Sequence, residues 1–162
     1  MGSLMSINVD LINPFIQGTQ SILRDVCQEE SKLGKIYLKK SPYASNTIAI
    51  IIGVTGDIKG QIIFSMGIDV ACSIASKMMM GMPVPELDEM AKSAIAELTN
   101  MILGNTATIF YNNGVSVDIT PPSLLMGDNM QISTTKMQTI CIPLQLSQGA
   151  TFEIDVAIQD AK

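Results

Sequence analysis

The residues best suited to chemistry lie in one polar stripe along a predicted helix over residues 86–111. On a helix of about 3.6 residues per turn, steps of four, four, three and four residues keep side chains within a face roughly 80° wide. The stripe consists of Glu89, Ser93, Glu97, Asn100 and Gly104. Glu97 and Asn100 place a carboxylate and a carboxamide side by side, with about 5–6 Å between their β-carbons. Both side chains are expected to point outward together.

Gly104 extends this stripe without a side chain. A glycine inside a helix costs about 1 kcal/mol relative to alanine, so we predict that another backbone approaches the helix here. Asn105 falls toward the apolar side and is predicted to be a hydrogen-bonded structural residue. The face predicted to meet the core carries Leu87, Ala91, Ala94, Leu98 and Ile102. An ordinary solvated helix has a polar face of the same kind, so spacing alone leaves that simpler role open.

Composition excludes several classes of site. The chain has no histidine, which removes Ser-His and Cys-His nucleophile pairs, histidine metal ligands and the usual proton shuttle near neutral pH. Ten Lys and Arg against fifteen Asp and Glu give a net charge of −5. Without a basic surface we expect no nucleic-acid partner. Any catalysis must therefore use carboxylates, amides, hydroxyls or thiols.

The three cysteines and the remaining aspartates indicate neither disulfides nor a metal site. Cys27, Cys72 and Cys141 are far apart in apolar segments, so we predict buried thiols in a reducing cytoplasm. The aspartates at 118, 128, 155 and 160 share no ligand spacing. Mean hydropathy is high, at +0.33, but the longest apolar run, residues 48–54, is far shorter than the roughly 20 residues of a membrane span. We expect no membrane association.

The elements that must position the stripe are helices and strands grouped in runs. Apolar spacing and turn residues predict helices over 8–30, 69–80 and 86–111. Segments rich in β-branched residues predict strands over 35–39, 47–54, 61–65, 115–119, 130–134, 139–146 and 151–158. This grouping favours an α+β fold, with a mostly antiparallel sheet and helices packed on its face. Residues 1–4, before Met5, are typical of a cloning scar and contain no export signal, which leaves 5–162 as one domain.

A weak internal repeat links the first and third predicted helices. Aligning Gly18 with Gly104 matches the residues around both glycines. The alignment pairs Leu11 with Glu97 and Pro14 with Asn100. We therefore predict that the first helix lacks the chemistry of the third.

The stripe also carries a family resemblance. Residues 93–100, Ser-Ala-Ile-Ala-Glu-Leu-Thr-Asn, followed by Gly104-Asn105 and then by Pro122, resemble the signature of the CheC, CheX and FliY family of chemotaxis phosphatases. Segments 12–16 and 56–64 are also similar to CheX members, so the likeness covers nearly the whole chain from Met5 on. A CheC-like protein carries two such sites and FliY a rotor-binding extension. The chain therefore resembles the single-site CheX type.

The resemblance implies an enzyme that hydrolyses the aspartyl phosphate of a CheY-like response regulator in the cytoplasm. Asn100 would orient the attacking water and Glu97 would dock on the partner's lysine, while Ser93, Gly104 and Pro122 would form the partner-binding surroundings. No cofactor of its own is implied, with Mg²⁺ carried by the receiver domain. A homodimer is implied as well. The alternative is a non-catalytic module of the same fold that binds a receiver or a flagellar-switch component.

Overall fold

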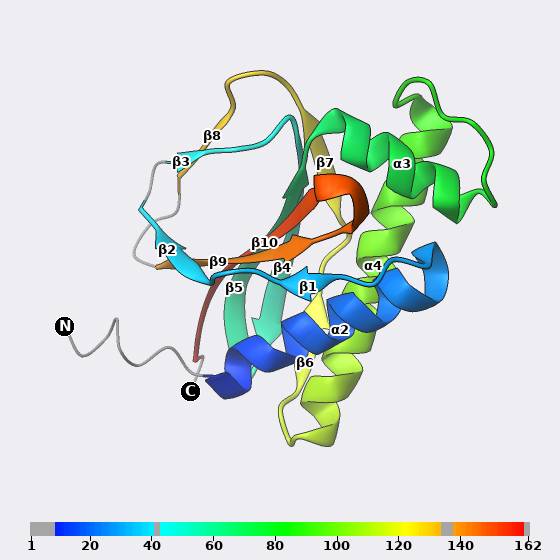
Figure 1. Cartoon of the computed structure of the whole chain (residues 1–162). Helices are drawn as coiled ribbons and strands as arrows, with labels where there is room; N and C mark the ends of the chain where they lie inside the picture. Colours follow the sequence, from blue (N-terminus) through cyan, green and yellow to red (C-terminus); the bar gives the residue numbers. More distant parts are fainter. Residues whose placement is uncertain (1–8, 41–42, 134–137, 161–162) are drawn as a thin grey trace.

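One antiparallel sheet, covered on one face by three helices, forms the framework of the computed structural model (Figure 1). The structure describes residues 9–40, 43–133 and 138–160. The predicted scar at residues 1–4 lies outside the described residues. The observed architecture confirms the predicted α+β class with helices on one face of a mostly antiparallel sheet.

The main sheet has the strand order β1-β9-β10-β5-β4-β6, with β2 also pairing with β9 and β7 with β4. All of these pairs are antiparallel. The strand bounds are β1 Lys32–Leu33, β2 Tyr37–Lys39, β4 Ile48–Gly56, β5 Ile58–Met66, β6 Val117–Ile119, β7 Ser123–Met126, β9 Thr139–Gln145 and β10 Thr151–Asp160. Two further strands, β3 Tyr43–Ala44 and β8 Gln131–Ile132, pair with each other as a separate sheet.

The helices are α2 Val9–Cys27, α3 Ile68–Met78 and α4 Glu89–Asn112, and a 3₁₀ turn spans Ser147–Gly149. The predicted start of the third helix at residue 86 is three residues too early. Asp88 caps α4 instead, because its Oδ1 accepts the backbone N–H of Ala91 at 2.9 Å and so satisfies an N–H at the open end of the helix. Among the residues described, no helix is long and apolar enough to cross a bilayer.

The core lies between the sheet and the helices. Alternate residues of the four central strands point to this side, as the two-residue period of a strand requires. Ile50, Ile62, Ile142 and Ile154 are typical, each with at most 1% of its surface exposed. On the opposite face of the sheet, Ala49 of β4 and Ile63 of β5 form a smaller apolar cluster with Ile132 of β8.

The fold is built from two halves with the same plan. Each half has a long helix, three short strands and then a pair of long strands: α2, β1, β2, β3, β4 and β5, then α4, β6, β7, β8, β9 and β10. In the centre of the sheet, β9-β10 of the second half lies beside β5-β4 of the first half, so that the equivalent strands β10 and β5 are neighbours and the equivalent strands β9 and β4 flank them. β3 likewise pairs with its counterpart β8. β1 and β2 of the first half pair with β9 of the second half. In the same way, β6 and β7 of the second half pair with β4 of the first half. Helices α2 and α4 are therefore structural equivalents.

Candidate functional site

The predicted polar stripe lies on the solvent-facing side of α4. Ser93, Glu97, Asn100 and Gly104 are all exposed. The buried residues of the same helix are Ala91, Ile95, Leu98, Thr99, Ile102, Leu103, Thr106 and Phe110. A carboxylate and an amide thus stand together on the outer face of a helix whose inner face is locked in the core.

Gly104 and Asn105 have different environments although they are neighbours. A β-carbon added to Gly104 would meet no heavy atom within 4 Å, so the surface beside Asn100 is open. Asn105 is half-buried, and its Nδ2 donates to the backbone carbonyl of Gly18 at 3.3 Å. This confirms the predicted structural role of Asn105.

A shallow hollow lies beside the stripe, between the first half of α4 and β7. It has a volume of about 540 Å³ and is lined by Glu89, Lys92, Ser93, Ala96, Leu124 and Met126. Lys92 is held by Glu89 through an ion pair at 3.0 Å. Met90 and Met126 are 65% and 46% exposed.

Pro122 lies in the short link between β6 and β7. This link is fixed to the sheet because the N–H of Thr120 donates to the Gly53 carbonyl at 3.0 Å, and the Gly53 N–H donates to Thr120 Oγ1 at 2.8 Å. Both strands that flank the link contact α4. Pro122 therefore belongs to a rigid segment that runs alongside the helix of the stripe.

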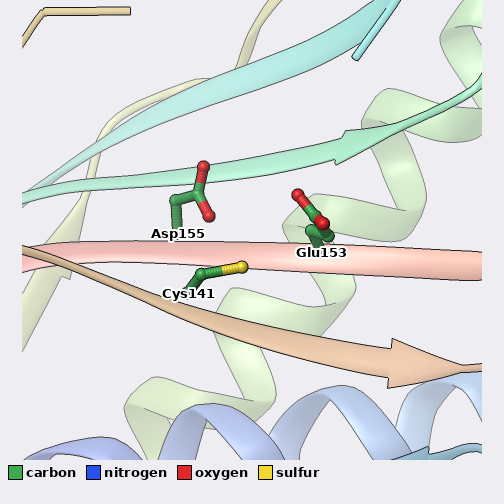
Figure 2. Close-up of side chains that lie close together, drawn as sticks. All are labelled: Cys141, Glu153 and Asp155. Atoms are coloured by element: carbon green, nitrogen blue, oxygen red, sulfur yellow. The ribbon is translucent and has the colours of Figure 1, made fainter. Parts of the chain in front are cut away.

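A second polar cluster, which sequence spacing did not reveal, lies on the sheet face away from α4. Figure 2 shows Cys141 of β9 with Glu153 and Asp155 of β10, and their three ligand-type atoms lie within 4.8 Å of one another. The ammonium of Lys39 binds Glu153 Oε1 and Asp155 Oδ2, both at 3.1 Å. Burial raises the pKa of the Cys141 thiol to about 12. The cluster is an internal ion-pair network with its own cation and a protonated thiol.

Glu29 anchors a third polar group, at the far end of α2. It is 5% exposed, and it accepts the backbone N–H of Ser147 at 3.1 Å, the Ser147 hydroxyl at 2.9 Å and the ammonium of Lys77. Burial alone would raise the pKa of Glu29, but the hydrogen bonds from Lys77 and Ser147 outweigh it and hold the pKa below its usual value. This carboxylate ties α2 to α3 and to the β9–β10 turn.

The structure corrects the predicted alignment of α2 with α4 by one residue. Thr19 and Thr106 are equivalent, because both are buried and each donates its hydroxyl to the carbonyl four residues earlier, at 2.7 and 2.8 Å. Thr19 and Thr106 are 87 residues apart in the sequence. Gly18 and Asn105, which are joined by a hydrogen bond, have the same separation. The Gly18–Gly104 match was wrong, since Gly18 lies in the helix crossing whereas Gly104 faces solvent.

The chain is similar to known proteins over most of its length. The family model for chemotaxis phosphatase CheX matches residues 48–145. A CheY-P phosphatase CheX from Thermotoga maritima is 32% identical over 149 residues, which cover 92% of this chain and 96% of that protein.

Solved structures extend the similarity to nearly the whole fold. A CheC-like superfamily protein from Shewanella sp. PV-4 has a TM-score of 0.85 and 29% identity, covering 94% of this chain and 99% of that one. A CheX-CheY-BeF3-Mg²⁺ complex from Borrelia burgdorferi has a TM-score of 0.78 and 32% identity, covering 94% and 100%.

Proposed function

The chain belongs to the chemotaxis phosphatase CheX family, and on that basis we propose that it hydrolyses the aspartyl phosphate of a CheY-like receiver domain. The observation that carries the proposal is the exposed pair Glu97 and Asn100 on the outer face of α4. A relative named as a CheY-P phosphatase matches nearly the full chain, and a similar structure is a complex with CheY. We place this activity in the cytoplasm.

The reaction requires little covalent chemistry from this chain. Phosphoryl transfer is catalysed mainly by positioning and by charge stabilisation. In the proposed step a water oxygen attacks the phosphorus, and the bond between the phosphorus and the aspartyl oxygen breaks. The products are the aspartate carboxylate and inorganic phosphate, and the proton released from water passes to a phosphate oxygen or to solvent. The receiver domain supplies the phosphoaspartate, a lysine and Mg²⁺.

Asn100 would hold the water in line with the bond that breaks. Its side-chain carbonyl accepts a hydrogen bond and its amide group donates two, and the side chain does not titrate. The helix beneath it is rigid: Leu98, Thr99 and Leu103 are buried, and Thr99 donates to the Ala96 carbonyl at 2.8 Å. A water-orienting group needs such a fixed base, because small displacements are costly in rate.

Glu97 would dock on the receiver's lysine. It lies one turn before Asn100 on the exposed face, so a lysine bound there would hold the phosphoryl group close to the amide. Docking removes water from the charge pair and strengthens it. Ser93 and Pro122 would position the partner, and the open surface at Gly104 would admit its backbone.

We also propose that two copies of the chain join through sheet edges as a homodimer. The sheet ends at β1 with β2 on one side and at β6 with β7 on the other, and the edge of a sheet presents unpaired backbone groups. Because the stripe faces away from the sheet, both sites would stay open. Light scattering should give twice 17.4 kDa, and a monomer mass at micromolar protein would contradict the dimer.

The test of the phosphatase function is the decay of a phosphorylated CheY-like receiver with and without this protein. We expect faster release of inorganic phosphate with wild-type protein and with Asn112→Ala, an exposed amide at the end of the same helix. Binding of the receiver without faster release would favour the non-catalytic module instead.

A further inference from the structure

The exposed face of α4 continues beyond Gly104 to the end of the helix. Between residues 93 and 111, all of which the structure describes, the exposed residues are Ser93, Glu97, Asn100, Gly104, Thr108 and Tyr111. Steps of three and four residues keep these side chains in one line along the helix. The pair Glu97 and Asn100 therefore lies inside a longer exposed line, of which the polar stripe is only the first part.

Two large apolar side chains are exposed on α4, and both lie on the face of this line. Met90 is 65% exposed and Tyr111 is 74% exposed, whereas the other large apolar side chains of the helix are buried or half-buried. Steps of seven residues lead from Met90 through Glu97 and Gly104 to Tyr111. A helix drifts by only about 20° in seven residues, so Met90 and Tyr111 project to the same side as Glu97.

Met90 and Tyr111 are almost equally far from Asn100, on opposite sides of it. At a rise of about 1.5 Å per residue, they lie roughly 15 Å before and roughly 16 Å after Asn100 along the helix axis. A compact domain of about 100 residues has a radius of gyration of about 13 Å, which corresponds to a diameter of roughly 33 Å. A receiver domain centred on Asn100 would therefore cover both apolar side chains.

The surface between Asn100 and Tyr111 can be covered by a partner at little cost. A β-carbon on Gly104 would meet no heavy atom within 4 Å, and the Thr108 hydroxyl already donates to the Gly104 carbonyl at 3.1 Å. Covering Thr108 therefore leaves no hydroxyl donor without a partner. Residues 98–112 contain no charged side chain. A surface without charges that ends in an aromatic residue has the composition of a protein interface core.

We propose that Met90 and Tyr111 are two apolar anchors through which a phosphorylated receiver domain docks on α4, one on each side of its phosphoaspartate. The inference rests on the proposed function of Glu97 and Asn100, and it adds the chemistry of the partner's surface. That surface should carry an apolar depression on either side of the phosphorylated site. Burial of the two side chains stabilises the ground state and the transition state of the docked complex equally. The anchors therefore control docking and leave the chemical step to Asn100.

The experiment measures kcat and KM of the full chain with a phosphorylated CheY-like receiver. Tyr111→Ala should raise KM by roughly 5–30-fold and Met90→Ala by roughly 3–10-fold, with kcat unchanged. Because the two positions are roughly 30 Å apart, the two factors should multiply in the double variant.

Conservative variants and a control test the apolar character of the anchors. Tyr111→Phe and Met90→Leu keep an apolar side chain of similar size, so their KM should stay close to that of wild type. Met80→Ala, which removes a side chain that is 97% exposed in the link between α3 and α4, should leave KM unchanged. Circular dichroism and thermal unfolding check that each variant is folded.

The outcomes separate this inference from the function on which it rests. An unchanged KM in Tyr111→Ala or in Met90→Ala overturns the two anchors while the phosphatase function stands, and so does a fall in kcat at constant KM. If wild type gives no acceleration, titration calorimetry with the receiver tests the anchors alone. A dissociation constant raised by both substitutions then supports docking without catalysis, whereas no binding by wild type refutes both proposals.

Discussion

Asn105 of α4 donates its side-chain amide to the backbone carbonyl of Gly18 in α2, with 3.3 Å between the nitrogen and the oxygen. The bond lies where the two equivalent helices cross. A β-carbon on Gly18 would overlap the hydroxyl oxygen of Thr106. The crossing fixes α4, and with it the orientation of the Glu97 and Asn100 pair, against the rest of the fold.

We expect Gly18→Ala to lower the free energy of unfolding by about 1–3 kcal/mol, because Thr106 must move out of a packed crossing. Gly104→Ala is the matched control, since its new methyl group enters open space and it should raise stability by up to about 1 kcal/mol through helix propensity. Urea unfolding measures both variants. Equal effects of the two substitutions would contradict the close crossing.

Gly104→Leu should raise the melting temperature and abolish acceleration of receiver dephosphorylation. Leucine is a better helix former than glycine by nearly 1 kcal/mol, and its side chain would fill the space assigned to the partner. Thermal unfolding and phosphate release, measured on the same preparation, check the two effects. Full activity in a stabilised variant would show that the partner does not bind at Gly104.

Glu29 should make stability depend on acid pH. Its pKa is lower in the folded chain than the ordinary value of 4.5, so its contribution is complete above pH 4.5 and is lost as pH falls through the folded value. We expect wild-type stability to fall more steeply below pH 4.5 than that of Glu29→Gln. Glu30→Gln, the exposed neighbour, serves as the control and should keep the wild-type slope. Parallel curves for wild type and Glu29→Gln would refute the assignment.

Glu97→Ala should weaken both binding of the receiver and the rate, because the partner's lysine would be buried without a counter-charge. The exposed Glu86→Ala, just before α4, should affect neither. Titration calorimetry with a receiver held in its phosphorylated form by an analogue measures the affinity. An unchanged dissociation constant would count against the lysine as the partner of Glu97.

Periodicity predicted much of this fold. The stripe on α4 and the long strands followed from spacing alone, because an amphipathic helix and half-buried strands each leave a repeating pattern. The strands β1, β3 and β7 were not predicted, whereas the equally short β2, β6 and β8 lie within longer predicted strands. The start of α4 depended on the side chain of Asp88.

Contacts between distant segments account for what spacing missed. Asp155 lies opposite Cys141 only through the register of β10 with β9, which neither segment specifies alone. The equivalence of Thr19 with Thr106 required the burial and hydrogen bonds of both helices, because matching glycines selected a register one residue away. Sequence spacing therefore placed Glu97 and Asn100 on the exposed face of the helix but did not give the register between the two halves.

The central claim is that Asn100 orients the water that hydrolyses the phosphoaspartate. The most direct measurement is the rate of phosphate release from a phosphorylated CheY-like receiver saturated with Asn100→Ala. Saturation separates the chemical step from docking. We predict a loss of roughly 10²–10³ in the acceleration, similar to removal of one oriented hydrogen-bonding group at an active site. Retention of more than about a tenth of the wild-type acceleration at saturation would contradict the account.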